Sequence, residues 1–124
     1  MPMTGETVVA DHVIGTIAGV AAREVDGVYQ LGKGAIRHAL GRVAGTADTT
    51  QGVSVEVGKK EVAVDLSIVV IYNYEIKNVA DNVRALIAER VEDMTGLVVK
   101  EVNIDIVDIH YEGKGKEPVG KRVE

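Results

Sequence analysis

Apolar residues recur at helical spacing over residues 9–24, near the start of the chain. Val13, Ile14, Ile17, Val20 and Ala21 fall three or four positions apart, which is the pattern of a helix with one buried face. Gly27 follows at a position suited to a left-handed stop. We therefore predict a first helix here, with Thr7 or Asp11 as its N-terminal cap; both side chains carry a suitable oxygen.

The pattern changes to strict alternation over residues 53–72. Val53, Val55 and Val57 alternate with polar residues, and the same period of two continues in residues 62–72. The intervening stretch 58–60 has the sequence Gly-Lys-Lys and predicts a turn. This region is expected to be a hairpin with one buried face.

Helical spacing returns over residues 78–95, where the stretch opens with Asn78 and closes at Gly96. A third alternating stretch occupies residues 98–111. The order helix, strand, strand, helix, strand predicts a two-layer α+β fold, with a three-stranded mixed sheet and the helices mainly on one face. A right-handed crossover through the second helix would make the last two strands parallel.

The last two strands both become apolar on their outward-facing positions near their C-terminal ends. If these strands are parallel, the apolar positions meet at one corner of the sheet. The pattern leaves two arrangements open: the first helix or residues 30–52 cover this corner, or it receives another subunit. The candidate self-association or partner surface consists of Val69, Ile71, Val107, Ile109 and Tyr111.

Length and charge divide the chain into three parts. A chain of 124 residues fits one domain, which we assign to residues 1–112, with a flexible basic connection at 30–52 and a disordered basic tail at 113–124. The net charge is −5, yet residues 30–47 contain basic residues and no acidic ones. The candidate electrostatic contacts are Lys33, Arg37, Arg42, Lys114, Lys116, Lys121 and Arg122.

The sequence lacks the residues that several classes of function require. The chain has no cysteine, so it offers no disulfide, thiolate metal site or cysteine nucleophile. The three histidines lack metal-ligand spacing, and Gly32-Lys33-Gly34 lacks the rest of a phosphate-binding loop. Asp65 and Asp105 could be neighbours on a polar sheet face, but no nucleophile accompanies them. We predict no catalytic residue, no cofactor and no metal site.

The N-terminus lacks the features of a signal peptide, and no apolar run is long enough to span a membrane. A cytoplasmic location is therefore expected. The core must be built mainly from β-branched residues, since the chain has 23 Val and 10 Ile but no Phe or Trp.

Several separated segments resemble one known family. The stretches Glu61-Val-Ala-Val-Asp-Leu-Ser-Ile-Val-Val, Val91-Glu-Asp-Met-Thr-Gly-Leu and Glu101-Val-Asn-Ile-Asp-Ile resemble the alkaline shock protein family of Gram-positive bacteria, also called envelope stress response proteins. The resemblance covers roughly residues 5–112. Tyr72-Asn73-Tyr74 departs from the Tyr-Gly turn expected after the long strand.

The resemblance implies a cytoplasmic, self-assembling protein that is linked to cell-envelope or alkaline stress. It also implies recruitment to the inner face of the membrane by a small membrane-anchored partner, and it supplies no catalytic residues. We expect a non-enzymatic, homo-oligomeric scaffold or adaptor. The alternative is an RNA-binding or other nucleic-acid-binding module, which the acidic body and the lack of Phe and Trp disfavour.

Overall fold

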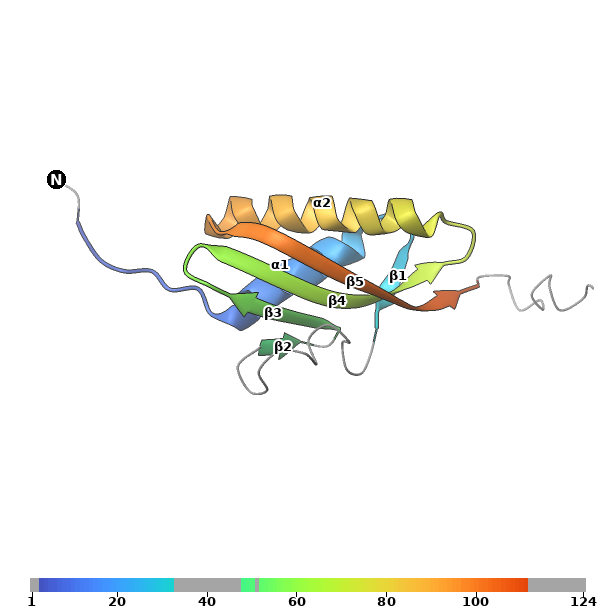
Figure 1. Cartoon of the computed structure of the whole chain (residues 1–124), viewed down its shortest axis with the longest axis horizontal. Helices are drawn as coiled ribbons and strands as arrows, with labels where there is room; N and C mark the ends of the chain where they lie inside the picture. Colours follow the sequence, from blue (N-terminus) through green and yellow to red (C-terminus); the bar gives the residue numbers. More distant parts are fainter. Residues whose placement is uncertain (1–2, 33–47, 51, 112–124) are drawn as a thin grey trace, which may run out of the picture.

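The computed structural model describes residues 3–32, 48–50 and 52–111 (Figure 1). Two helices and five strands make up this part of the chain, and the strands form one mixed sheet. In chain order the elements are α1 (Asp11–Glu24), β1 (Val28–Leu31), β2 (Asp48–Thr50), β3 (Val53–Val57), β4 (Glu61–Ile71), α2 (Ile76–Thr95) and β5 (Val98–His110).

Both predicted helices are present, but three of their predicted ends are wrong. Helix α1 ends at Glu24 with the extended Val25 as its C-cap, so Gly27 is not its stop. Helix α2 begins at Ile76, two residues before the predicted Asn78.

The start of α1 differs as well. Its N-cap is Ala10, which provides no side-chain hydrogen bond, so neither Thr7 nor Asp11 caps the helix. Asp11 is instead the first helical residue, where a negative charge interacts favourably with the helix dipole. The α2 helix ends as predicted at Gly96, whose φ of 78° is left-handed and whose N–H donates to the Glu92 carbonyl (2.9 Å).

Strand β4 organises the sheet because it pairs with three other strands. Along one edge it pairs in parallel with β5, as the crossover through α2 requires. Its other edge is shared, since β3 pairs with the first half of β4 and β1 with the second half, both antiparallel. The junction lies at Ser67. Its backbone carbonyl accepts a hydrogen bond from the Gly32 N–H (2.8 Å), and its backbone N–H donates to the Gly52 carbonyl (2.9 Å).

The two-layer α+β fold and the three long strands are confirmed, while the sheet has two strands more than predicted. The additional strands β1 and β2 contain four and three residues. Alternation cannot be detected over so few positions, and their pairing with β4 and β3 depends on residues far away in the sequence. They occupy both ends of the expected connection 30–52, and its middle, 33–47, lies outside the described residues.

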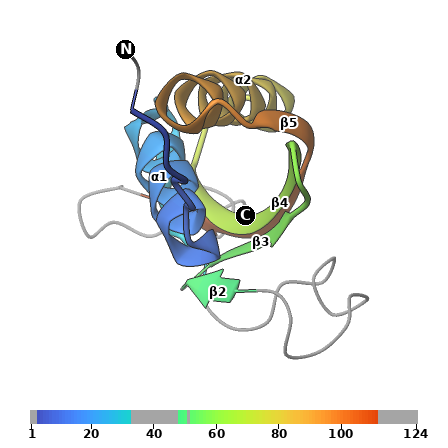
Figure 2. The same cartoon turned by 90° about the vertical axis from the view of Figure 1, so that its left-hand side faces the viewer.

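The hydrophobic core lies between the two helices and the curved inner face of the sheet. Viewed end-on, strands β3, β4 and β5 form an arc whose open side is closed by α1 and α2 (Figure 2). The alternating residues of β4 that were predicted to be buried all point into this core, namely Val62, Val64, Leu66, Ile68 and Val70. Helix α2 contributes four residues of its apolar stripe, namely Val79, Val83, Ile87 and Val91.

The opposite face of β4 was expected to be exposed, but it is buried. Asp65 and Ser67 on this face are buried, and so is Ser54, the partner of Asp65 on β3. Asp65 and Asp105 are also not cross-strand neighbours, because β5 pairs Asn103 with Asp65 and Asp105 with Ser67. The Asn103 amide donates to Asp65 Oδ1 (2.9 Å), so the group directly opposite Asp65 is an amide and not a second carboxylate.

Candidate partner-binding surface

One end of the sheet collects segments that are distant in the sequence. Since β4 and β5 are parallel, their C-terminal ends meet, with Ile71 paired to His110. Strand β1 begins at the same level, because Val28 pairs with Val70. Helix α2 starts here as well, directly after the turn that leaves β4. Three strands and a helix terminus therefore converge on this end.

A tight turn after β4 projects side chains outward from this end. The Tyr74 N–H donates to the Ile71 carbonyl (3.2 Å), and Asn73 has a left-handed φ of 82°. Asparagine tolerates this conformation better than other side chains, so it can replace the glycine of the Tyr-Gly turn that the family resemblance led us to expect. The Tyr72 N–H donates to the His110 carbonyl (2.8 Å), which ties the turn to the end of β5.

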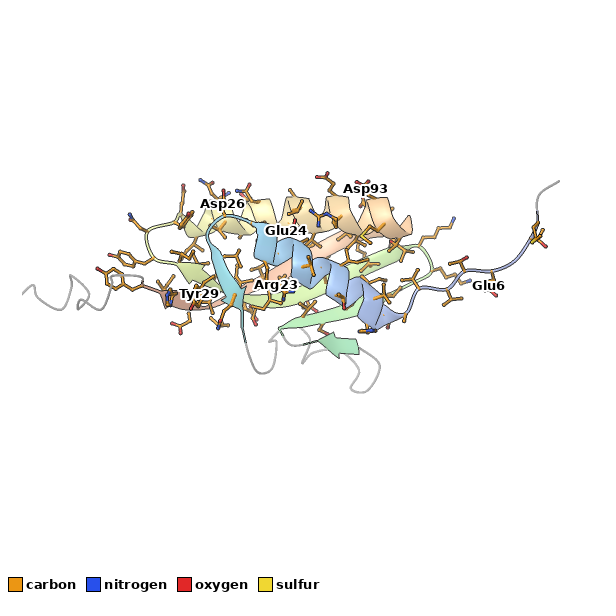
Figure 3. The ribbon with its side chains drawn as sticks, turned by 180° about the vertical axis from the view of Figure 1, so that it is seen from behind. Glu6, Arg23, Glu24, Asp26, Tyr29 and Asp93 are labelled. Carbon is orange, nitrogen blue, oxygen red and sulfur yellow. The ribbon has the colours of Figure 1, made fainter. Side chains whose placement is uncertain are left out.

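All four tyrosines of the chain lie at this end, and the chain has no Phe or Trp. Tyr72 and Tyr111 meet edge to face with ring centroids 5.2 Å apart. Tyr29 from β1 stacks on His110 from β5 at 3.7 Å, and Figure 3 shows Tyr29 near the end of β5. We name this surface the aromatic end; it comprises Tyr29, Tyr72, Tyr74, Ile76, Val107, Ile109 and Tyr111.

The five residues predicted as a contact surface are all near this end, but a bulge in β5 divides them between two faces. Ladder partners shift between Ile68 and Val69, which leaves Val107 as the extra residue. Val107 stays on the outer face, near Gly32 and Ser67, and is 51% exposed. Ile109 becomes the partner of Val70 and is 41% exposed.

The remaining three predicted residues are more enclosed. Val69 is buried, and Ile71 and Tyr111 are half-buried. Because β1 and β5 flank β4, the stacked Tyr29 and His110 rings lie across β4 near Val69. The sequence pattern missed Tyr29, Tyr74 and Ile76, because they belong to a short strand, a turn and a helix start, which have no readable alternation. Tyr72 was predicted as the last alternating residue on the buried face of the second strand, but it lies in the turn after β4 and is 54% exposed.

Tyr74 is held in place by close packing against Gly27. A Cβ atom added to Gly27 would lie 2.7 Å from the Tyr74 ring and 2.7 Å from a Val79 methyl group. The Gly27 carbonyl also accepts a hydrogen bond from the Ile71 N–H (2.8 Å). The glycine therefore positions both the end of β4 and the ring that follows it.

The predicted electrostatic contacts cannot be placed relative to this surface. Lys33, Arg37 and Arg42, together with Lys114, Lys116, Lys121 and Arg122, all lie outside the described residues. Within residues 3–32, 48–50 and 52–111, no group of three or more His, Asp or Glu side chains could hold a metal ion. None of the helices in the described ranges is both long and apolar enough to cross a membrane.

Among the described residues, the ion pair between Glu24 of α1 and Arg90 of α2 joins the two helices and shifts the pKa of Glu24. Arg90 Nη2 donates to Glu24 Oε1 at 2.8 Å. This hydrogen bond, together with the positive charge of the guanidinium, holds the pKa of Glu24 below its usual range. The pair lies on the helical layer rather than among the tyrosines, so it links α1 to α2 and does not form part of the aromatic end.

Comparison with curated proteins identifies several relatives. The chain is 39% identical over 105 residues to a stress response regulator gls24 homolog from Streptococcus pyogenes; the match covers 85% of this chain and 59% of that protein. It is 34% identical over 113 residues to the uncharacterized protein YqhY of Bacillus subtilis; this match covers 91% of this chain and 83% of that protein. The chain thus matches just over half the length of the streptococcal relatives.

Solved structures with a similar fold share little sequence with this chain. Two variants of MamM-CTD superpose with TM-scores of 0.53 and 0.52 at 10% and 11% identity. The matches cover 78% and 86% of this chain and 95% and 88% of those structures. This likeness concerns the fold alone.

The family comparison agrees with the sequence motifs described above. The model of the alkaline shock protein 23 family, described by a cell envelope-related function, matches residues 2–111. The match includes both helices and all five strands. The resemblance that the sequence motifs indicated is thereby confirmed, and the chain belongs to the alkaline shock protein 23 family.

Proposed function

We propose that this protein is a non-enzymatic, self-associating scaffold or adaptor of the cell-envelope stress response, and that the aromatic end is its main contact surface. The observation that carries the proposal is the concentration of exposed tyrosine and aliphatic side chains at one end of the sheet. Tyrosine is enriched at protein interfaces, because its ring buries a large area with little loss of conformational entropy. A second copy of the chain is the proposed partner.

The family supports the cellular context of this proposal. Its description names a cell envelope-related function, and the streptococcal relatives are named stress response regulators. We place this protein in the cytoplasm, peripheral to the inner face of the membrane. A small membrane-anchored protein is the proposed partner that recruits it there, as the family resemblance implies.

Replacement of Ile109 by Asp tests the proposed contact surface. Ile109 is 41% exposed, so the carboxylate would remain hydrated in a single copy but would be desolvated in an interface. We expect Ile109→Asp to lower the oligomeric mass and to weaken association at least about tenfold. Size-exclusion chromatography with light scattering over a range of concentrations measures the mass directly.

Val98→Asp is the matched control for this experiment. Val98 lies on the same strand, is 51% exposed and lies at the opposite end of β5. The control should keep the oligomeric mass of the unmodified protein, and circular dichroism should show both variants folded. A monomeric unmodified protein at high concentration, or equal effects of the two variants, would contradict the proposal.

The uneven charge distribution leads to a separate prediction. The tail 113–124 carries four basic and two acidic residues, whereas the whole chain has a net charge of −5. Contacts between the tail and an acidic surface should weaken in salt, because screening acts over roughly 10 Å at 0.1 M ionic strength. Deleting residues 113–124 should reduce both the association and its salt dependence, as measured by sedimentation velocity. If neither salt nor deletion changes the sedimentation profile, the tail has no electrostatic role in assembly.

A further inference from the structure

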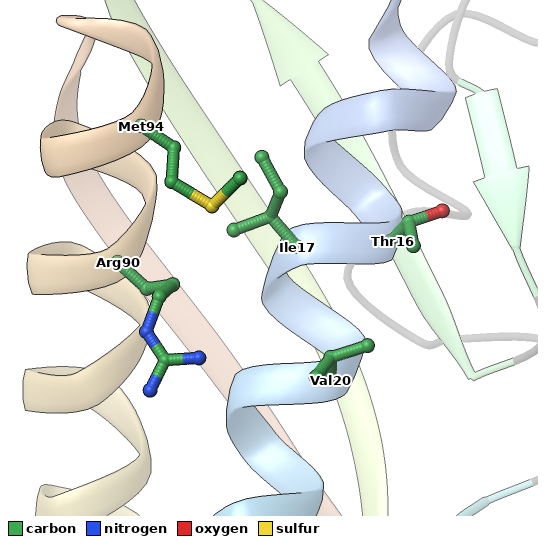
Figure 4. Close-up of a pocket in the computed structure, with 5 residues that line it drawn as sticks. All are labelled: Thr16, Ile17, Val20, Arg90 and Met94. Carbon is green, nitrogen blue, oxygen red and sulfur yellow. The ribbon is translucent and has the colours of Figure 1, made fainter.

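An apolar groove runs between the two helices, away from the aromatic end. Its cavity of about 210 Å³ is lined by Thr16, Ile17, Val20, Arg90 and Met94. Figure 4 shows Met94 and Ile17 pointing toward one another across the groove. Met94, which lines the cavity, is 64% exposed, so the groove presents an apolar side chain to solvent. Methionine adapts its shape readily and is common at surfaces that receive a peptide.

The residues before α1 form an extended arm that carries apolar side chains. Residues 3–10 have no helix or strand, and Ala10 has an extended backbone with ψ of 147°. Val9 packs against the core, whereas the adjacent Val8 is 79% exposed. Successive side chains of an extended chain point in opposite directions, so the anchoring of Val9 turns Val8 outward. The arm leaves the body of the molecule, as Figure 1 shows.

We propose that the arm of one copy lies in the groove between α1 and α2 of a second copy, with Val8 in the cavity beside Met94. An apolar protein cavity of about 150 Å³ is large enough to bind benzene. The groove therefore has room for a valine side chain. Burial of Val8 would remove two exposed apolar surfaces from water at once, that of the arm and that of Met94.

Charge and spacing favour the same placement. In an extended arm Glu6 lies on the same side as Val8 and about 6.6 Å away. In α2, Arg90 precedes Met94 by one turn, a rise of about 6 Å. When Val8 is beside Met94, Glu6 thus reaches the Arg90 guanidinium. Arg90 already binds Glu24, but its five donors can serve two carboxylates.

This interface is separate from the aromatic end, so either proposal can fail alone. The aromatic end lies where α2 begins, whereas Met94 is in the last turn of α2. Arms exchanged reciprocally would give a closed pair, while one-way insertion would give an open chain of copies.

Disulfide trapping tests the arm contact. The chain has no cysteine, so every disulfide would come from the introduced residues. Val8→Cys and Met94→Cys are made as separate full-length proteins, mixed and oxidised. We expect a covalent heterodimer on a non-reducing gel, in at least about tenfold excess over the control mixture, because docking raises the local thiol concentration. The control mixture replaces Met94→Cys by Lys77→Cys, at an exposed position in the first turn of the same helix.

Two results would overturn the proposal. One is a heterodimer yield no higher than that of the control mixture. The other is a monomeric disulfide in the double variant Val8→Cys/Met94→Cys without heterodimer in the mixture, which would place the arm in the groove of its own chain. Repeating the trapping in the Ile109→Asp background separates the two interfaces, since the arm contact should remain there.

Discussion

At the scale of single residues, two glycines with the same backbone handedness have different roles. Gly27 and Gly96 have φ values of 98° and 78°, a region that other residues rarely adopt. Gly27 contacts Tyr74 and Val79, whereas an added Cβ at Gly96 would meet nothing within 4 Å. Gly96 therefore provides a helix stop. Gly27 does not, because α1 ends at Glu24 with the extended Val25 as its C-cap; it provides the space that Tyr74 occupies.

Alanine substitution should separate these two roles. In Gly96→Ala the alanine must adopt the left-handed backbone conformation, which should lower the free energy of unfolding by roughly 1–2 kcal/mol. Gly27→Ala adds the same cost together with the overlap with Tyr74 and Val79, roughly 1–3 kcal/mol more. Urea unfolding monitored by circular dichroism measures both changes. Equal losses of stability in the two variants would show that the Tyr74 contact does not limit this position.

The ion pair between Glu24 and Arg90 makes a prediction about pH. The pKa of Glu24 is lowered in the folded protein, so the pair stabilises the fold above the ordinary value of 4.5. That contribution is lost as the pH falls through the lowered, folded-state pKa. In Arg90→Gln the pKa of Glu24 should rise toward its ordinary value, which a carboxyl NMR titration can follow. An unchanged titration midpoint would mean that the ion pair does not persist in solution.

At the scale of elements, the parallel pairing of β4 with β5 combines apolar and polar contacts. The apolar contacts lie on the inner face, and the Asn103–Asp65 hydrogen bond lies on the other face (2.9 Å). Asn103 also donates to Glu101 Oε2 (2.6 Å), so both of its amide hydrogens are in use. This amide fixes the register of a strand that would otherwise depend on similar aliphatic side chains.

Removal of the Asn103 amide should therefore destabilise the sheet. Asp65 is buried, so Asn103→Ala deprives a buried carboxylate of one donor, at a cost of about 1–3 kcal/mol. Lys100→Ala is the control on the same strand, where the side chain is exposed and its contact with Glu61 is long (4.0 Å). Thermal unfolding of both variants gives the comparison. The interpretation fails if Asn103→Ala is no less stable than Lys100→Ala.

The sequence predicted long elements well and short ones poorly. Both helices and strands β3, β4 and β5 were predicted because each carries several turns or alternations of apolar residues. Residues 28–31 and 48–50 are too short for such a signal. The bulge at Val107 was equally unreadable, and it moved Ile109 to the face of Val70, away from Val107. The five residues predicted as a contact surface thus lie near one end of the sheet, but their division between two faces could not be predicted from the sequence.

At the scale of the whole molecule, the described residues have two apolar surfaces in different places. The aromatic end lies where β4, β5 and β1 converge, and the groove lies between α1 and the last turns of α2. If both surfaces act as proposed above, one molecule can bind two neighbours at the same time. This arrangement fits a scaffold, whose task is to hold several copies together.

The most direct test of the aromatic end is a residue-resolved NMR map of self-contact. Isotope-labelled protein is mixed with a rising excess of unlabelled protein, and the loss of signal is followed at each backbone and side-chain position. We predict concentration-dependent losses at Tyr72, Tyr111, Val107 and Ile109, with Val98 at the other end of β5 unaffected. Spectra that do not change with concentration, or losses confined to the β3–β4 turn, would contradict the proposed role of the aromatic end.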